Sequence, residues 1–193
     1  GITVHVPPAT VSVEREAPGN QWVDVLVTLK QKTAILGQPV TIAIEVLSDK
    51  PLLQRPEPEM TIPWFISPPG FVAEAPPVAQ RREEDALPIT IDGKYYNFAQ
   101  ETITRDGRKR FRLSFEREVT PVKTGRILLD SAVFQGVVAD QIGRDVFGST
   151  IARSTARVVK SSAPVEIEVK DVPAEGRPPS FTNAVGAFTV QLK

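Results

Sequence analysis

Proline is spread along most of this chain, and it limits how much helix the chain can form. Eighteen of the 193 residues are proline, close to twice the usual share of about 5%. Proline interrupts helix interiors but is tolerated at strand starts, sheet edges and turns. The apolar residues favour strands too, because 24 Val and 13 Ile outnumber 11 Leu and β-branched side chains pack well on a pleated sheet. The sequence therefore predicts a mostly antiparallel, all-β protein.

Two segments near the N-terminus alternate apolar and polar residues with the period of a half-buried strand. In residues 22–29, one face consists of Val23, Val25, Val27 and Leu29. Residues 40–46 repeat the pattern, with Thr41, Ala43 and Glu45 on the outer face. A glycine-containing turn separates the two segments, and this spacing is typical of a β-sandwich. We therefore expect an immunoglobulin-like antiparallel β-sandwich.

Further strands are expected along the rest of the chain. One of them spans 61–66, with Trp64 as a core anchor. Residues 67–88 are rich in proline and predict a long exposed loop, and residues 140–149 predict a polar loop with room for one helical turn. The remaining strands are expected at 89–91, 94–96, 100–104, 110–118, 126–129, 132–139, 151–159 and 165–169.

Composition shifts divide the chain into three parts. Residues 1–21 predict an N-terminal arm, and residues 22–172 the immunoglobulin-like sandwich with its Pro-rich insertion near 67–88. Residues 173–193 predict a stiff linker and the first strand of a truncated second β-sandwich. Large apolar groups left in water would form an adhesive patch. We therefore expect the interdomain junction to be packed against the first domain through Phe181, Val185, Gly186 and Phe188.

Charge and reactive side chains argue against several function classes. Lys+Arg and Asp+Glu both number 23, whereas nucleic-acid binders usually carry a clustered basic excess. There is no Cys, and His5 is the single His, so thiol chemistry is excluded and a His-based triad or metal site has little to draw on. No apolar run is long enough to cross a bilayer, and the start at Gly1 shows no leader, which predicts a mature protein or an excised piece. We expect no enzyme activity, no cofactor, no metal and no nucleic-acid partner.

Three clusters leave functional alternatives open. The basic stretch 105–112 is either a reader of anionic groups or a charged hairpin edge that discourages edge-to-edge pairing. The charged run 81–85 lacks the spacing of a calcium loop, which favours a solvated loop. A sugar-binding platform is the alternative to core packing for four aromatic residues, namely Trp22, Trp64, Tyr95 and Tyr96.

Several motifs in the second half give the chain a recognisable order. They are Asp-Gly-Arg at 106–108, Thr-Pro-Val-Lys-Thr-Gly at 120–125, Pro-Val-Glu-Ile-Glu-Val at 164–169, and a Pro-rich junction at 178–190 with Phe, Val-Gly and Phe. Leu-Gly-Gln-Pro-Val at 36–40 fits the same pattern. In this order the chain resembles the BatD family of oxygen-tolerance, or aerotolerance, proteins. The resemblance covers about 25–193 and is strongest after residue 106.

The resemblance implies the extracytoplasmic portion of a periplasmic, membrane-anchored protein, with a signal peptide in the precursor and an anchor outside this chain. The family pattern contains no catalytic residues. It implies a non-catalytic protein–protein interaction or scaffold domain of an envelope complex linked to oxygen or oxidative stress tolerance. The expected partners are other envelope proteins, above all von Willebrand A-domain Bat-type proteins. The alternative function is a carbohydrate- or peptidoglycan-binding β-sandwich module.

Overall fold

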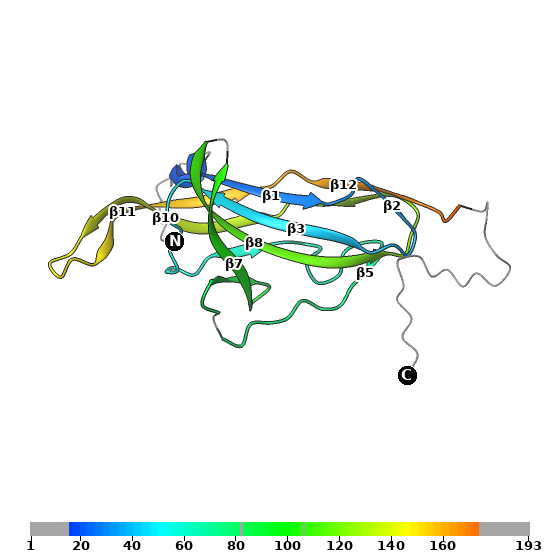
Figure 1. Cartoon of the computed structure of the whole chain (residues 1–193), viewed down its shortest axis with the longest axis horizontal. Coiled ribbons are helices and arrows are strands. Elements are labelled where there is room, and N and C mark those ends of the chain that lie inside the picture. The colour runs from blue at the N-terminus through cyan, green and yellow to red at the C-terminus, as the bar shows by residue number, and fades with distance from the viewer. Residues whose placement is uncertain (1–15, 82, 106, 174–193) are drawn as a thin grey trace, which may run out of the picture.

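The computed structural model describes residues 16–81, 83–105 and 107–173, and strands dominate it (Figure 1). The expected tail strand and the junction residues Phe181, Val185, Gly186 and Phe188 lie outside the described residues. In chain order the elements are the 3-10 helix η1 (Pro18–Trp22) and the strands β1 (Val23–Leu29), β2 (Thr33–Ile35), β3 (Val40–Ser48), β4 (Glu59–Thr61), β5 (Phe71–Val72), β6 (Ala86–Ile91), β7 (Lys94–Arg105), β8 (Arg108–Pro121), β9 (Gly125–Leu129), β10 (Val133–Arg144), β11 (Thr150–Ser161) and β12 (Val165–Lys170).

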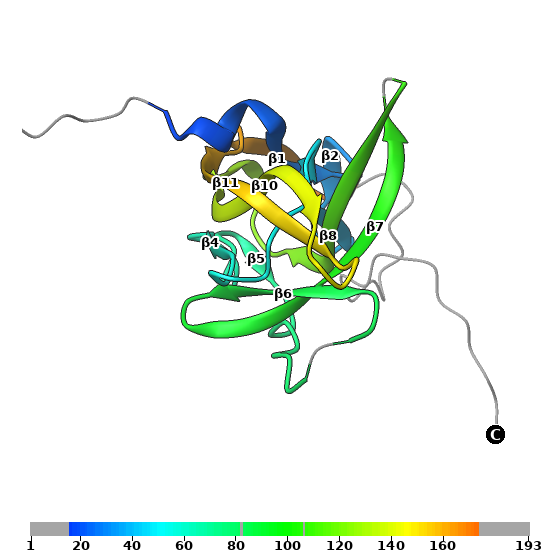
Figure 2. The same cartoon turned by 90° about the vertical axis from the view of Figure 1, so that its left-hand side faces the viewer.

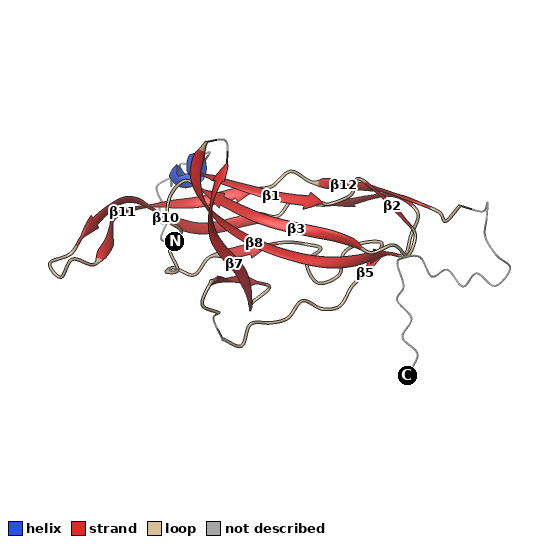
Figure 3. Cartoon of the chain, in the orientation of Figure 1, coloured by secondary structure: helices blue, strands red, loops and turns tan. Residues whose placement is uncertain are grey.

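The strands form one long sheet and one small sheet. The long sheet runs in the order β1-β3-β8-β7-β6-β4-β10-β11, with β5 paired to β8, and the small sheet runs β2-β12-β9. Neighbours are antiparallel except β2 with β12 and β4 with β6. The long sheet curls until its end strands β1 and β11 lie close together, and its two halves face each other as layers (Figure 2). The predicted all-β sandwich is confirmed (Figure 3).

The two layers of the long sheet separate between β7 and β8. β7 pairs with β8 only as far as Ala99, opposite Ser114. The preceding residues of β7, 94–99, pair with β6 in the other layer. Aromatic rings fill the space beside the split, because the ring centroid of Phe115 lies 5.2 Å from that of Phe98 and 5.5 Å from that of Phe65. The split matters for function because it ends the pairing of one edge of β8.

One hydrophobic core lies between the layers and runs from Val23 in β1 to Val169 in β12. The inner faces predicted for 22–29 and 40–46 are buried as expected, except that Leu29 is half-buried. Ala43 was predicted on the outer face but is buried as well. It lies beside Glu116 of the neighbouring strand, and the longer side chains around a small residue cover it.

The 3-10 helix η1 packs against β11 rather than standing free. Gly19 and Asn20 are both buried, and the side-chain oxygen of Asn20 accepts a hydrogen bond of 2.8 Å from the backbone N–H of Val159. A Cβ on Gly19 would lie 2.7 Å from a carbonyl oxygen of β11, so a side chain there would force the two elements apart. The packed body therefore includes the end of the segment 1–21 predicted as an arm.

One strand prediction needs correction in the Pro-rich part of the chain. The strand expected at 61–66 is wrong, because β4 ends at Thr61 and the backbone then turns, with the N–H of Phe65 bonded to the oxygen of Ile62 at 3.0 Å. Proline at position 63 cannot donate to a ladder. Trp64 is nevertheless buried, 2% exposed, which confirms it as a core residue.

Three further boundaries differ from the prediction. The expected loop 67–88 contains the two-residue strand β5 and the first residues of β6. The expected strands 94–96 and 100–104 are parts of one strand, β7. Its first half pairs with β6 and its second half with β8, so the strand continues past the point where its neighbour changes. The first half of the expected loop 140–149 is strand, since β10 continues to Arg144 against β11. Polar residues are compatible with a strand here because both arms of the hairpin are largely exposed to solvent.

Candidate functional site

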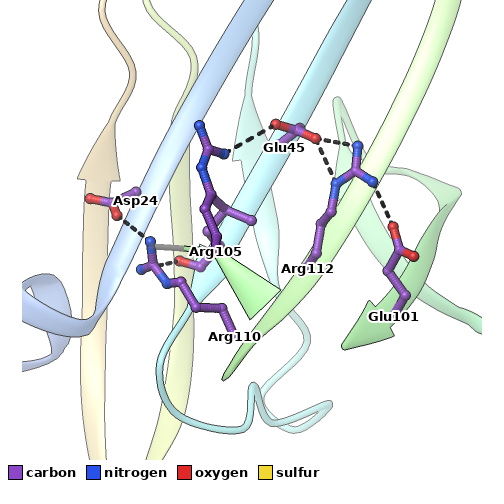
Figure 4. Close-up of polar contacts among 7 residues, drawn as sticks. Asp24, Glu45, Glu101, Arg105, Arg110 and Arg112 are labelled. Atoms are coloured by element: carbon purple, nitrogen blue, oxygen red, sulfur yellow. Dashed lines mark hydrogen bonds and ion pairs between the residues drawn. The ribbon is translucent and has the colours of Figure 1, made fainter. Parts of the chain in front are cut away.

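The predicted basic stretch 105–112 lies in a network of ion pairs that crosses β1, β3, β7 and β8 (Figure 4). Arg112 contacts Glu45 on one side and Glu101 at 2.6 Å on the other. Burial alone would lower the pKa of Arg112, but hydrogen bonds to Glu101 and Glu45 raise it above its ordinary value. The carboxylates thus neutralise this arginine where an anion reader would need it free.

The other two arginines of the network are paired in the same way. Arg110 bridges Asp24 at 2.8 Å and Asp49 at 2.7 Å, and Arg105 lies 3.9 Å from a carboxylate of β3. Cross-strand pairs of this kind each contribute only a few tenths of a kcal/mol up to about 1. Their arrangement across four strands favours the interpretation of Arg105, Arg110 and Arg112 as members of a charged sheet face whose charges are paired within it.

A different feature of β8 is open, namely the edge that β7 leaves. β3 pairs with β8 from Phe111 to Val119 on one side. On the other side β7 ends its pairing at Ser114, and β5 pairs only with Thr120 and Pro121. Among the described residues, the stretch 115–119 has no strand partner on this second edge. We call it the open edge.

Two hydrogen bonds reveal which backbone groups point out of the open edge. Thr41 of β3 accepts a bond of 3.2 Å from Lys30 on the β1 side, so its neighbours in β3 bond toward β8 by the alternation of an antiparallel ladder. Directly after β8, the N–H of Val122 donates a hydrogen bond of 2.9 Å to the carbonyl oxygen of Gly70, the residue before β5. Even-numbered residues of β8 therefore point toward the open edge. The N–H and C=O groups of Glu116 and Glu118 face outward there.

The open edge forms one wall of a groove of about 540 Å³. The opposite wall is the segment 72–77, which includes Pro76 and Pro77. Proline has no N–H, so Pro76 and Pro77 cannot donate to a ladder with β8. Three acidic residues line the groove, namely Glu74, Glu116 and Glu118.

Arg117 holds the far wall of the groove in place. Its side chain is only 8% exposed, and its guanidinium donates to the carbonyl oxygens of Phe65 and, at 2.8 Å, Glu74. It also lies over the Phe65 ring, 5.9 Å from the centroid. Burial lowers the pKa of Arg117, and the nearby Tyr96 opposes that shift. Its Nε is buried with no hydrogen-bond partner among the described residues. Because its guanidinium joins β8 to carbonyl groups of two other segments, this arginine is a structural clamp. It also carries positive charge beneath the groove.

The structure separates the four aromatic residues of the predicted sugar-binding platform. Trp64 and Tyr96 belong to the core, at 2% and 1% exposure, and Lys50 covers the ring of Trp22 at 5.0 Å. Only Tyr95 presents much of its ring to solvent. Trp64 and Tyr96 are therefore excluded as sugar-binding residues, and core packing is confirmed for Trp64.

Tyr95 instead lines a small pocket of about 280 Å³ with Glu57, Gln80, Arg81 and Asn97. Its hydroxyl donates to Glu57 at 2.8 Å, and the side-chain amide of Asn97 donates to the backbone of Arg81 at 3.0 Å. The amide oxygen of Asn97 is buried and has no partner among the described residues. The pocket thus offers an aromatic ring and hydrogen-bonding groups to a small polar molecule.

We expect both tyrosines of the chain to titrate above pH 10, the ordinary value. The hydrogen bond to Glu57, then its charge and then burial raise the pKa of Tyr95. Burial and then Asp92 raise that of Tyr96, with Arg117 opposing. A raised pKa means that the folded state favours the neutral phenol, so this contribution to stability is present below pH 10 and is lost as the pH rises through the raised pKa.

Phenolate absorbance as a function of pH measures this titration. Glu57→Gln should return the Tyr95 transition toward pH 10 and leave the Tyr96 transition in place, and Tyr95→Phe identifies which transition is which. An unchanged curve in Glu57→Gln would contradict the role of the carboxylate.

Neither a family model, nor a curated protein, nor a solved structure matches this chain. Within the described ranges, no group of three or more His, Cys, Asp or Glu is placed to hold a metal ion. No helix in the described part of the chain is long and apolar enough to span a membrane.

Sequence reasoning predicted β8 as a strand but missed its open edge. One signal was present, because continuing the alternation of Phe111, Leu113 and Phe115 places Arg117 on the inner face. A charged residue at an inner position indicates either a clamp or a site. Which edge of the strand lacks a partner depends on β5 and β7, and no local pattern records that.

Proposed function

We propose that this chain is a non-catalytic protein-interaction domain that binds an extended segment of a partner protein as an added strand along β8. The observation that carries the proposal is the open edge, where the backbone groups of Glu116 and Glu118 face a groove and have no partner among the described residues. Strand addition to an exposed edge is a recurring mode of peptide recognition, in which main-chain hydrogen bonds supply affinity.

The dimensions of the groove suit a short extended peptide. Five residues of open edge span about 17 Å at about 3.4 Å per residue. β5 already occupies the next two positions of the same edge, opposite Thr120 and Pro121. An added strand would therefore continue the line of β5 toward β7 and complete the sheet between them.

The charge of the groove favours a basic segment as the occupant. Glu74 and Glu118 have no ion pair among the described residues, and Glu116 pairs with Lys30 at 3.0 Å. Lysine or arginine side chains on an added strand would meet these carboxylates. Opposite charge across an interface steers association and selects the partner.

We further propose an envelope setting for this interaction, on the basis of the motifs that resemble BatD. In that setting the domain is periplasmic and the full-length protein is held at the membrane by an anchor outside this chain. The basic segment then belongs to another envelope protein, with a von Willebrand A-domain Bat-type protein as the first candidate, in a complex linked to oxygen tolerance.

A peptide of alternating lysine and valine is the probe for the open edge. We expect it to bind in a salt-dependent manner, and we expect methylation of alternate backbone nitrogens to abolish binding because the added strand then loses its donors. Glu74→Lys with Glu118→Lys should weaken binding at least about tenfold, which is about 1.4 kcal/mol. Isothermal titration calorimetry measures each affinity.

Glu59→Lys serves as the matched control, because Glu59 is also an exposed acid but lies on β4 in the other layer. It should bind the peptide like the unmodified protein. Equal binding of an N-methylated peptide would rule out strand addition. Equal binding of a peptide with glutamate in place of each lysine would rule out the charge argument.

A carbohydrate-binding function is the second candidate, and the Tyr95 pocket favours it. An exposed aromatic ring beside Asn97, Gln80 and Arg81 is a combination that stacks on and hydrogen-bonds to a sugar. Saturable binding of peptidoglycan fragments that Tyr95→Ala abolishes, with the fold intact, would support this function. Binding that persists in Tyr95→Ala would exclude this pocket as the sugar site.

A further inference from the structure

The hairpin of β10 and β11 projects well beyond the body of the protein (Figure 1). Irregular register at Asp140 and Gln141 marks where the outer part of the hairpin begins, and bulges of this kind bend and twist a strand pair. Its tip carries Val146 and Phe147, which are 93% and 89% exposed. Among the described large apolar residues these two are the most exposed.

The tip is a built turn. Asp145 accepts hydrogen bonds at its side-chain oxygen from the backbone N–H groups of Phe147 at 2.9 Å and Ser149 at 2.8 Å. Its own N–H donates to Ser149 at 3.0 Å, and Gly148 donates to its carbonyl at 3.1 Å. The two apolar side chains are therefore held outward by the geometry of the turn, and the Asp145 carboxylate is engaged within it.

Apolar residues continue behind the tip on both faces of the hairpin. Ile142 and Ile151 are 51% and 42% exposed. Ile142 is paired with Ala152 and Ile151 with Gly143, and successive positions of a strand face opposite sides. The two isoleucines therefore lie on opposite faces. A hairpin that docks flat on a protein is apolar on one face, whereas apolar residues on both faces and at the tip suit a medium that surrounds the tip.

Each face also carries one arginine. Arg144 follows Ile142 by two positions and shares its face, and Arg153 shares the face of Ile151, with its side chain lying over Gly143 where a larger residue would collide with it. Both arginines are exposed, and neither has an ion pair among the described residues. Long cationic side chains beside an apolar tip reach phosphate groups at a lipid–water interface.

We propose that the β10–β11 tip inserts into the interface of an anionic lipid surface. Val146 and Phe147 enter the boundary of the acyl chains, and Arg144 and Arg153 bind headgroup phosphates from the two faces of the hairpin. This contact is separate from the open edge of β8 and from any anchor outside this chain. It would orient the domain on a membrane, with the hairpin pointing toward the lipid.

Co-sedimentation of the whole chain with vesicles tests the proposal. We expect binding to vesicles of equal parts phosphatidylglycerol and phosphatidylcholine, and much weaker binding to phosphatidylcholine alone. Val146→Asn with Phe147→Asn should reduce the partition coefficient at least about tenfold, because both apolar groups that enter the lipid are lost. Arg144→Gln with Arg153→Gln should remove the preference for the anionic vesicles.

Val122→Asn is the matched control, since Val122 is an exposed apolar residue in the turn after β8; it should bind vesicles like the unmodified protein. Phe147→Trp reports insertion, because brominated acyl chains should quench its fluorescence more than that of the unmodified protein, which contains only Trp22 and Trp64. Absence of binding to the anionic vesicles, binding that survives the double Asn variant, or no quenching of Phe147→Trp by brominated lipid would each overturn the proposal.

Discussion

Trp64→Ala should destabilise this domain by about 3–5 kcal/mol, the range typical of removing a large aromatic from a core. The indole is 2% exposed and lies in the turn after β4, where it joins the core cluster. Its ring N–H donates to the backbone oxygen of Asp130 at 2.7 Å. The substitution thus leaves a cavity and, in addition, a carbonyl without its donor.

Urea unfolding measures this loss as a lower transition midpoint at an unchanged slope. Trp64→Phe separates the two contributions, because it keeps most of the apolar volume and loses the hydrogen bond, and we expect it to cost about 1–3 kcal/mol. Trp22→Ala is the matched control, since Trp22 is only partly buried. A Trp64→Ala variant less than about 1 kcal/mol below the unmodified protein would show that Trp64 is not a core anchor.

Arg117→Ala should cost about 2–6 kcal/mol, because it leaves two carbonyl groups without their donor at about 1–3 kcal/mol each. Those carbonyls belong to Phe65 and Glu74, in two separate segments of the Pro-rich region. The same substitution should weaken binding of the lysine–valine peptide, since the far wall of the groove loses its attachment to β8. Stability and peptide affinity should therefore fall together.

Arg117→Lys tests the clamp geometry, because a lysine keeps the charge but lacks the planar fork that reaches two acceptors at once. We expect an intermediate loss of stability. Arg126→Ala provides the control, as Arg126 is exposed and lies 3.8 Å from Glu166, so its removal should change stability by less than about 0.5 kcal/mol. Equal stability of Arg117→Ala and Arg126→Ala would exclude the clamp.

β8 illustrates what a local pattern predicts and where it stops. The alternation of Phe111, Leu113 and Phe115 with polar residues predicts the strand and its inner face, on which Leu113 is buried and the two Phe are half-buried. The pattern does not record that β7 leaves at Ser114, because that break depends on the rest of β7, residues 94–99, pairing with β6 in the other layer. No local sequence pattern therefore predicts the open edge.

The basic stretch 105–112 shows the same limit for charge. A count of arginines along the chain suggests a cationic patch. Glu45 and Asp24 come from strands more than fifty positions away in the sequence, and the sheet register places them against those arginines. Pairing with distant residues decides whether such a run is an anion site or a neutral sheet face.

The sequence by itself determined the all-β class, the inner faces of 22–29 and 40–46, and the core position of Trp64. These properties depend on side-chain period, β-branching and turn residues, which are local. The tertiary structure decided the continuous β7, the extension of the β10–β11 hairpin, the groove beside β8 and the clamp of Arg117. Each of these depends on which distant strands share an edge, and a strand has the same local pattern whether its edge is paired or open.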